Sequence, residues 1–152
     1  MVRELQKSDL AEAAAMLAAL HAVHRENVPG IFGDRSVGHF EKEAARILKD
    51  RRQLKLVYQK GAQLQGICVA SVRPVNNPAI GRIGEVHSLY VCPACRRQGV
   101  ATALLQAMLT AIRQKGVGHV QLKVWAFNEP AAAFYKKVGF QSLFETMDYV
   151  LR

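Results

Sequence analysis

The sequence contains few aromatic residues, few cysteines and no long hydrophobic run. Aromatic residues make up 7% of the 152 positions and include one tryptophan. This disfavours a single-strand nucleic-acid site, because such sites stack bases on several exposed rings. No run of about 18 apolar residues is present, which excludes a membrane-spanning helix. The polar start over residues 1–9 is unlike a signal peptide, and three cysteines cannot all pair, so a reducing cytoplasm is the expected compartment.

Acidic residues are also scarce. Twelve Asp and Glu face 21 Lys and Arg, which gives a formal net charge of +9. An anionic partner is therefore expected, and nucleic acid, a phosphorylated cofactor and an acidic protein all fit. Half of the residues are hydrophobic, and a chain of this length can bury one core. We expect a single domain over residues 1–152.

Hydrophobic periodicity predicts an α/β protein. Helices are expected over residues 9–24, 37–50, 99–115 and 130–137, with Ser8 and Ser36 as the N-caps of the first two. Strands are expected over residues 2–6, 54–59, 63–72, 82–91, 119–126 and 140–151. His21 and His24 continue the apolar stripe of the first helix. Since strands flank helices, a mixed sheet covered by helices is expected.

The segment Arg96-Arg97-Gln98-Gly99-Val100-Ala101-Thr102 lies where a predicted strand ends and a long helix begins. Backbone N–H groups and the helix dipole can hold a phosphate at such a place, and Gly99 lets the chain approach its ligand closely. The segment matches neither of the two commonest phosphate loops. Its form, Arg-x-x-Gly-x-Ala, resembles the acetyl-coenzyme A (acetyl-CoA) loop of the GNAT superfamily of N-acetyltransferases.

Neighbouring segments extend this resemblance over essentially the whole chain. Leu89-Tyr90-Val91-x-Pro93 precedes the loop as in that family, and the segment from Asn128 to Phe140 is similar to its second signature. The resemblance implies a mostly antiparallel sheet in which two adjacent strands splay into a V. It also implies direct transfer of an acetyl group from acetyl-CoA to a primary amine in a ternary complex, without a metal.

The resemblance further implies where acetyl-CoA binds. Loop amides and two arginines would meet its phosphates, and a bulge would free the main chain of the preceding strand to pair with the pantetheine arm. Arg97 departs from the family, where glycine is frequent. The expected contacts are Leu89, Tyr90, Val91, Arg96, Arg97, Gln98, Gly99, Val100, Ala101, Thr102 and Asn128.

Transfer requires a neutral amine, but an amine of pKa ~10 is about one part in a thousand neutral at pH 7. Period 2 places Glu85, His87, Leu89 and Val91 on one face of their strand, so Glu85 and His87 are the candidate bases. Glu85 is preferred, because an acceptor could meet it through water, although imidazoles titrate nearer neutral pH. Tyr135 matches the family's usual general acid. The alternatives are a surface glutamate, a hydrogen-bonded core histidine and a tyrosine that only fills the core.

Two patterns suggest metal or redox chemistry. Cys92-Pro93-Ala94-Cys95 lacks the second pair that zinc sites usually show, and His21-x-x-His24 with Glu26 is at most a half-site. We expect no metal, and expect the histidines to border the acceptor site together with residues 29–32. The basic run over residues 46–55 is expected to be a solvated helix C-terminus.

The rival functions are a catalytically silent acyl-CoA-binding or interaction module and a nucleic-acid-binding domain. Neither a zinc finger nor a recognition-helix pattern supports the second rival, so no nucleic acid is expected as a partner. The acceptor stays open among protein N-termini, lysines, amino acids, antibiotics and other small amines. Polyamines are less expected for a basic protein. A homodimer through the last strand, which is common in the family, is a further option.

Overall fold

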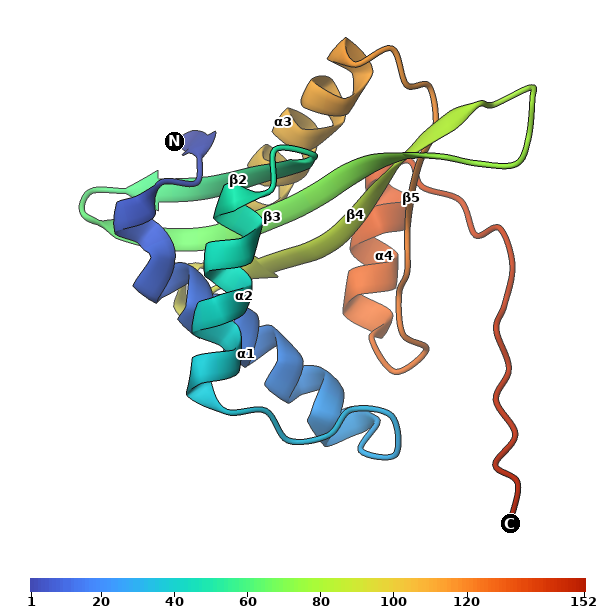
Figure 1. Cartoon of the computed structure of the whole chain (residues 1–152), viewed down its shortest axis with the longest axis horizontal. Coiled ribbons are helices and arrows are strands. Elements are labelled where there is room, and N and C mark those ends of the chain that lie inside the picture. Colours follow the sequence, from blue (N-terminus) through green and yellow to red (C-terminus); the bar gives the residue numbers. More distant parts are fainter.

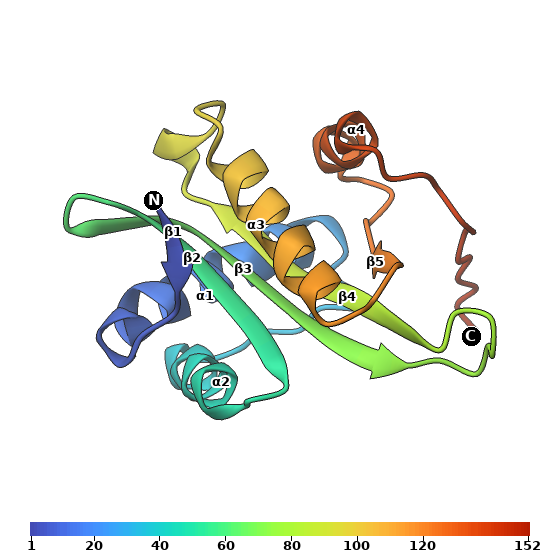
Figure 2. The ribbon, with the colours of Figure 1, turned by 90° about the horizontal axis from the view of Figure 1, so that it is seen from above.

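The computed structural model describes all 152 residues and contains one five-stranded sheet in the order β1-β2-β3-β4-β5. Neighbouring strands are antiparallel except β4 and β5, which are parallel. Helices α1 and α2 cover one face of the sheet, and α3 and α4 lie on the other (Figures 1 and 2). The expected mixed, mostly antiparallel α/β fold is confirmed.

The elements are β1 (Val2–Glu4), a 3₁₀ turn (Lys7–Asp9), α1 (Leu10–Asn27), α2 (Val37–Lys49), β2 (Gln53–Lys60), β3 (Gln63–Pro74), β4 (Arg82–Val91), a 3₁₀ turn (Pro93–Cys95), α3 (Val100–Gln114), β5 (Val120–Leu122) and α4 (Glu129–Val138).

Strand β3 separates two hydrophobic cores by the alternation of its side chains. Ile67 and Val69 pack with α1 and α2, whereas Cys68 and Ala70 pack with α3. Helix α3 lies so close to the sheet that a Cβ at Gly84 would be 2.7 Å from Ile112 Cγ2. Glycine is needed there because the two elements touch without a side chain between them.

The start of α1 differs from the prediction. A 3₁₀ turn precedes the helix, and Asp9, not Ser8, stabilises this junction. The buried Asp9 carboxylate accepts the Gln6 amide at 2.7 Å and two Arg3 N–H groups at 2.7 and 2.9 Å. These bonds lower the pKa of Asp9. The exposed Ser8 has no such partners, because a charged carboxylate that is paired with arginine makes the stronger bonds.

Lys55 corrects the expectation of a wholly solvated basic run. Arg46, Lys49 and Arg52 are exposed, but Lys55 is 8% exposed. Its Nζ donates to the carbonyls of Ile47, Leu48 and Asp50 at 3.1, 2.8 and 2.9 Å. The ammonium group therefore satisfies the last carbonyls of α2, which have no partner within the helix.

The C-terminal third has less strand than predicted. Strand β5 covers three residues, because the chain then leaves the sheet and Trp125 packs its ring on Phe32, with centroids 5.1 Å apart. Residues 141–152 form no strand and make no backbone hydrogen bond, since no neighbouring strand lies beside them. The segment stands apart from α4 in Figure 1. None of the helices combines the length and the apolar character that crossing a membrane requires.

We predict that Lys55→Met lowers the free energy of unfolding by about 2–4 kcal/mol, because the methionine fills the space but leaves buried carbonyls unpaired. Urea denaturation measures this change. Lys42→Met, at an exposed position of α2, is the control and should change stability by less than about 0.5 kcal/mol. Equal losses in both variants would contradict the capping role of Lys55.

Candidate active site

The centre of the site is a β-bulge in β4. Val86 lies opposite Ala70 and Ser88 lies opposite Val69, so His87 is one extra residue on its strand. A bulge changes the face to which the following side chains point. The even residue Val86 packs on the α3 side before the bulge, and the odd residue Val91 does so after it.

The bulge overturns one expectation about the candidate bases. Leu89 and Val91 pack with α3, whereas Glu85 and His87 bond to Arg73 and Ser71 on β3. These two β3 residues continue the alternation of side chains that face α1 and α2. The four residues therefore do not share one face, because the extra residue interrupts the period of two between Glu85 and Leu89.

Strands β4 and β5 part next to the bulge. Strand β5 pairs only with Gly84, Glu85 and Val86, and β4 continues to Val91 without a neighbour on that side (Figure 2). The expected V-shaped opening is confirmed. The main-chain groups of residues 87–91 that point to this side pair with no strand, and they can pair with an extended ligand in the way that they would pair with a strand.

The loop after β4 provides a row of unused donors. None of the backbone N–H groups of residues 97–102 donates to another group of the chain. Gly99 has a φ of 81° and precedes the first turn of α3. Six free amides at the positive end of a helix dipole form a cradle for phosphate oxygens.

Two side chains of the loop, those of Arg96 and Gln98, already donate hydrogen bonds to nearby backbone carbonyls. Arg96 Nε donates to the Val91 carbonyl at 3.1 Å, and its guanidinium lies 5.8 Å from the centre of the Tyr90 ring. Gln98 donates to the Ala94 carbonyl at 3.2 Å. Arg96 therefore fixes the loop to the end of β4. Arg97 has a φ of 60°, the one positive value outside glycine, which explains why glycine suits this position.

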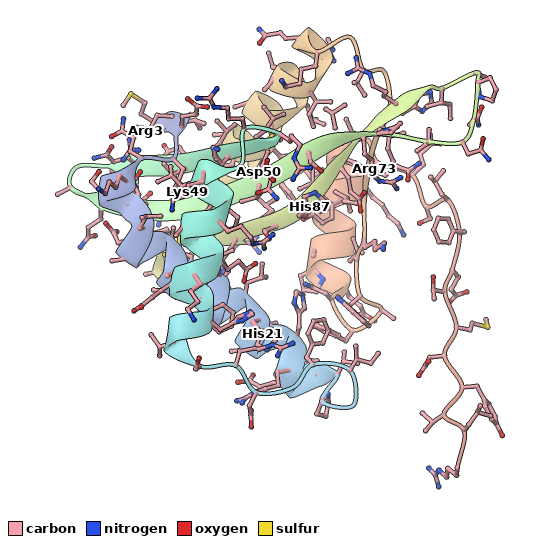
Figure 3. The ribbon with its side chains drawn as sticks, viewed as in Figure 1. Arg3, His21, Lys49, Asp50, Arg73 and His87 are labelled. Carbon is pink, nitrogen blue, oxygen red and sulfur yellow. The ribbon has the colours of Figure 1, made fainter.

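On the α1 and α2 side, the two candidate bases have different partners. Glu85 Oε2 accepts Arg73 Nε at 2.6 Å, and this bond lowers the pKa of Glu85. The His87 ring Nε2 lies 2.6 Å from Ser71 Oγ, and His87 is exposed. Figure 3 shows Arg73 and His87 on the part of the sheet beyond α2. The carboxylate is therefore committed to an arginine, while the imidazole has only a hydroxyl partner.

Four polar residues occupy directly opposite positions across four strands, and we call them the polar strip. Gln53 pairs with Ser71, Ser71 with Glu85, and Glu85 with Gln121. The buried Gln53 Oε1 has no hydrogen-bond partner. An unpaired buried oxygen is costly, so Gln53 is the least satisfied polar residue of the strip. Ser71, Glu85 and Gln121 lie in predicted strands, but Gln53 lies one residue before the predicted strand 54–59, so the sequence did not indicate the complete strip.

An aromatic cluster borders this side of the site. The His24 ring stacks on Phe32 with centroids 5.1 Å apart and lies 6.4 Å from Trp125. Burial and the neighbouring His21 lower the pKa of His24. His21 Nε2 lies 2.9 Å from the Gly33 carbonyl, and Figure 3 shows His21 near the end of α1. Both histidines are thus used to hold the α1–α2 connection, and no three metal-ligating side chains gather anywhere in the chain.

Tyr135 lies on α4 against the α3-side core. Burial, followed by the nearby Cys68, raises the pKa of Tyr135 to about 12. Cys68 is opposite Leu89 in the sheet, so the tyrosine lies by the unpaired stretch of β4. Its hydroxyl keeps its proton at neutral pH and bonds to no other group of the chain. Asn128 Oδ1 accepts the Ala131 amide at 3.2 Å and caps α4.

The fold and the site define a class of protein: a sheet that parts beside a loop of free amides, suited to an extended ligand that carries phosphate. The sequence model described as the acetyltransferase (GNAT) family matches residues 17–140. The chain belongs to this family, and the resemblance found in its sequence is confirmed.

Known relatives agree with this assignment. The chain is 35% identical over 81 residues to a mycothiol acetyltransferase of Catenulispora acidiphila, covering 53% of this chain and 26% of the relative. It is 39% identical over 67 residues to an N-alpha-acetyltransferase of Sulfurisphaera tokodaii, covering 43% of this chain and 40% of the relative. The matches thus span less than half of either relative. An aminoglycoside antibiotic 6'-N-acetyltransferase of Acinetobacter haemolyticus has the same fold, with a TM-score of 0.79, 19% identity, and coverage of 100% of this chain and 98% of that one.

We predict that Arg97→Gly raises the free energy of unfolding by about 1 kcal/mol, because glycine accepts a positive φ without strain. The same change should weaken binding of CoA several-fold at low salt, since a cation near the phosphates is lost, and less at high salt. Arg97→Ala is the matched control: it should weaken binding equally but without any gain in stability. Thermal unfolding and calorimetry measure the two effects, and equal stability of both variants would argue against backbone strain.

Proposed function

We propose that residues 1–152 act as one N-acetyltransferase domain that transfers the acetyl group of acetyl-CoA to a primary amine. The observation that carries this proposal is the continuity of two features, the unpaired edge of β4 over residues 87–91 and the six free amides that follow it. Pantetheine is an extended chain with amide groups, and it leads to a pyrophosphate. Along the protein, the unpaired edge of β4 comes before the phosphate cradle, in the same order in which pantetheine leads to the pyrophosphate.

The residues of the cradle fit the charge of this ligand. The amides of residues 97–102 would bond the pyrophosphate, with Arg97 as an exposed cation and Arg96 already held beside the cradle. Leu89 and Val91 would bind through their main chain. Tyr90 and Asn128, like Leu89, stay among the residues that we expect to contact acetyl-CoA. Asn128 would contribute its free Nδ2, because its oxygen caps α4.

His87 is the base that the contacts favour. The bond from Arg73 makes Glu85 a weaker base, and a tightly held carboxylate is less free to approach an amine. His87 is exposed and is oriented by Ser71. It would take the ammonium proton, directly or through a water, before the amine nitrogen bonds to the acetyl carbon. This reverses the preference for Glu85 that the sequence alone suggested.

Tyr135 supplies the second proton. As the carbon–sulfur bond breaks, its hydroxyl would donate to the leaving thiolate of CoA, and the second proton, which the amine nitrogen loses as the amide forms, would restore the hydroxyl. Its raised pKa, about 12, keeps the hydroxyl protonated at neutral pH, so that it is a hydrogen-bond donor when the thiolate forms. Its position by Cys68 and Leu89 suits this role, because the pantetheine arm would end near them.

The acceptor would bind on the α1 and α2 face, against the polar strip. The strip contains one carboxylate, Glu85, and it is already paired with Arg73, whose Nε lies 2.6 Å from Glu85 Oε2. A polycation would find no spare negative charge there. The strip therefore suits a single amine accompanied by hydroxyl or amide groups, which Gln53 and Gln121 can bond.

Thiol release measured over a panel of amines tests the transfer itself. Acetyl-CoA-dependent release with at least one acceptor is expected. Tight binding of CoA with no release for any amine would support the rival reading, a catalytically silent binding module.

We predict that Tyr135→Phe lowers turnover by roughly ten- to a thousandfold, because it removes the proton donor and keeps the ring in the core. Calorimetry should show unchanged affinity for CoA. Phe134→Leu, a neighbouring change in the same core, is the control for packing and should affect turnover less. Normal turnover of Tyr135→Phe would return Tyr135 to a packing role.

We predict that His87→Gln removes the acidic limb of the log kcat/KM profile. A base must be deprotonated, so the rate falls as pH falls and the base binds a proton, and a glutamine has no such step. Glu85→Gln should keep the limb. If only Glu85→Gln removed it, Glu85 would be the base, and if both variants kept it, neither residue would be.

A further inference from the structure

Three residues act on the Glu85 carboxylate at the opening between β4 and β5. Arg73 Nε bonds to it at 2.6 Å, and His87 and Lys123 are also near enough to lower the pKa of Glu85. None of these three neighbours is a carboxylate. The charged groups at this place are thus one anion, two cations and an imidazole, so the opening carries a net positive charge at neutral pH.

Lys123 lies at the edge of the opening, across from His87. The last pair between β4 and β5 joins Val86 to Leu122, and one more pair in this register would join His87 to Lys123. The strands part there instead (Figure 2). Leu122 packs with α3, so Lys123, the next residue, faces the other side, toward Glu85. Lys123 is exposed and takes part in no ion pair within the chain.

Arg73 is a second cation with donors to spare. Its Nε is used by Glu85, whereas Nη1 and Nη2 bond to no group of the chain, and the side chain is 49% exposed. The free end of a guanidinium matches the two oxygens of a carboxylate. Arg73 comes from β3 and Lys123 from the end of β5, so an acid group placed beside Glu85 meets a cation from each side.

These charges discriminate among amines. A simple ammonium ion is repelled by Arg73 and Lys123, and the one carboxylate that could attract it, Glu85, is already paired. An amine that also carries a carboxylate is attracted instead. With its carboxylate at the two cations, its amine is free to point across the opening toward His87. The polar strip supplies hydroxyl and amide groups, and these cations add a place for an acid group.

We propose that the acceptor is an amino acid whose carboxylate binds between Arg73 and Lys123 while its amine faces His87. The inference deepens the proposed function and rests on it, because it names the class of amine that the transfer uses. The side chain of the amino acid extends toward the aromatic cluster: Trp125 follows Lys123 by two residues and packs on Phe32, with centroids 5.1 Å apart.

Thiol release from acetyl-CoA with amino acids and with their amides tests the class of acceptor. Alanine, methionine and phenylalanine are each compared with the corresponding carboxamide. The amine of the carboxamide is more often neutral, because it lacks the carboxylate that stabilises the ammonium form, so basicity alone favours the amide. At least one amino acid should exceed its amide in kcat/KM by roughly ten- to a hundredfold. Release in which no amino acid exceeds its amide would overturn the inference and leave the proposed transfer intact.

Calorimetry with the CoA-loaded protein separates the inference from the proposed transfer. CoA carries no acetyl group, so an amino acid binds to this complex without reacting. At least one of the three amino acids should bind, and its amide should bind roughly tenfold or more weakly. Such binding without any thiol release from acetyl-CoA would contradict the proposed transfer but keep the carboxylate site. No binding, or equal binding of acid and amide, would overturn the site.

Charge variants test the two cations. Lys123→Gln should raise KM for the amino acid roughly tenfold, with kcat and the kinetics of the amide nearly unchanged, because it removes one carboxylate contact. Lys123→Glu should reverse the preference toward the amide. Lys115→Gln, at an exposed lysine that follows α3, is the matched control and should change neither substrate.

Arg73 is tested in a Glu85→Gln background, where it has no carboxylate partner of its own to lose. Adding Arg73→Gln should raise KM for the amino acid roughly tenfold and spare the amide. Equal losses for the acid and the amide, in this variant and in Lys123→Gln, would give the two residues a structural role and overturn the carboxylate site.

Discussion

One extra residue in β4 determines how the two sides of the site are arranged. With His87 inserted, the chain after it turns Leu89 and Val91 toward α3, while Glu85 and His87 stay on the side of α1 and α2. The parting of β4 from β5 begins at the same point. A single backbone irregularity therefore opens the sheet and divides its residues between the two faces.

The phosphate cradle depends on how closely α3 packs against the sheet. Gly84 lies against Ile112 near the end of α3, and a Cβ at Gly66 would be 2.9 Å from Leu104 Cδ1 near its start. The helix is thus held at both ends, and its first turn carries the free amides of residues 100–102. Such rigid support keeps donors aimed at a ligand, which loops alone do less well.

The sequence predicts the structure correctly where local pattern decides it. The apolar spacing of α3 is an example, because Leu104, Leu105, Met108 and Ile112 are all fully buried. The sequence-based prediction is wrong where residues far apart in the chain decide the structure. The bulge at His87 depends on the register with β3, and the burial of Lys55 depends on carbonyls at the end of α2. Residues 141–152 form no strand because no other strand lies beside them. Ser8 was a reasonable cap by residue type, but Arg3 brought a better partner to Asp9.

The division of faces also bears on how the proposed reaction handles two protons. His87, on the α1 and α2 face, would accept one from the amine, and Tyr135, on the α3 side, would give one to the thiolate. His87 and Tyr135 would thus handle different protons on different faces of the sheet, so Tyr135 would not pass its proton directly to His87. The raised pKa of Tyr135 keeps its hydroxyl protonated at neutral pH. The sheet between them must be open for the amine to reach the thioester. The parting of β4 from β5 provides such an opening, and it begins at His87, the residue that we propose as the base.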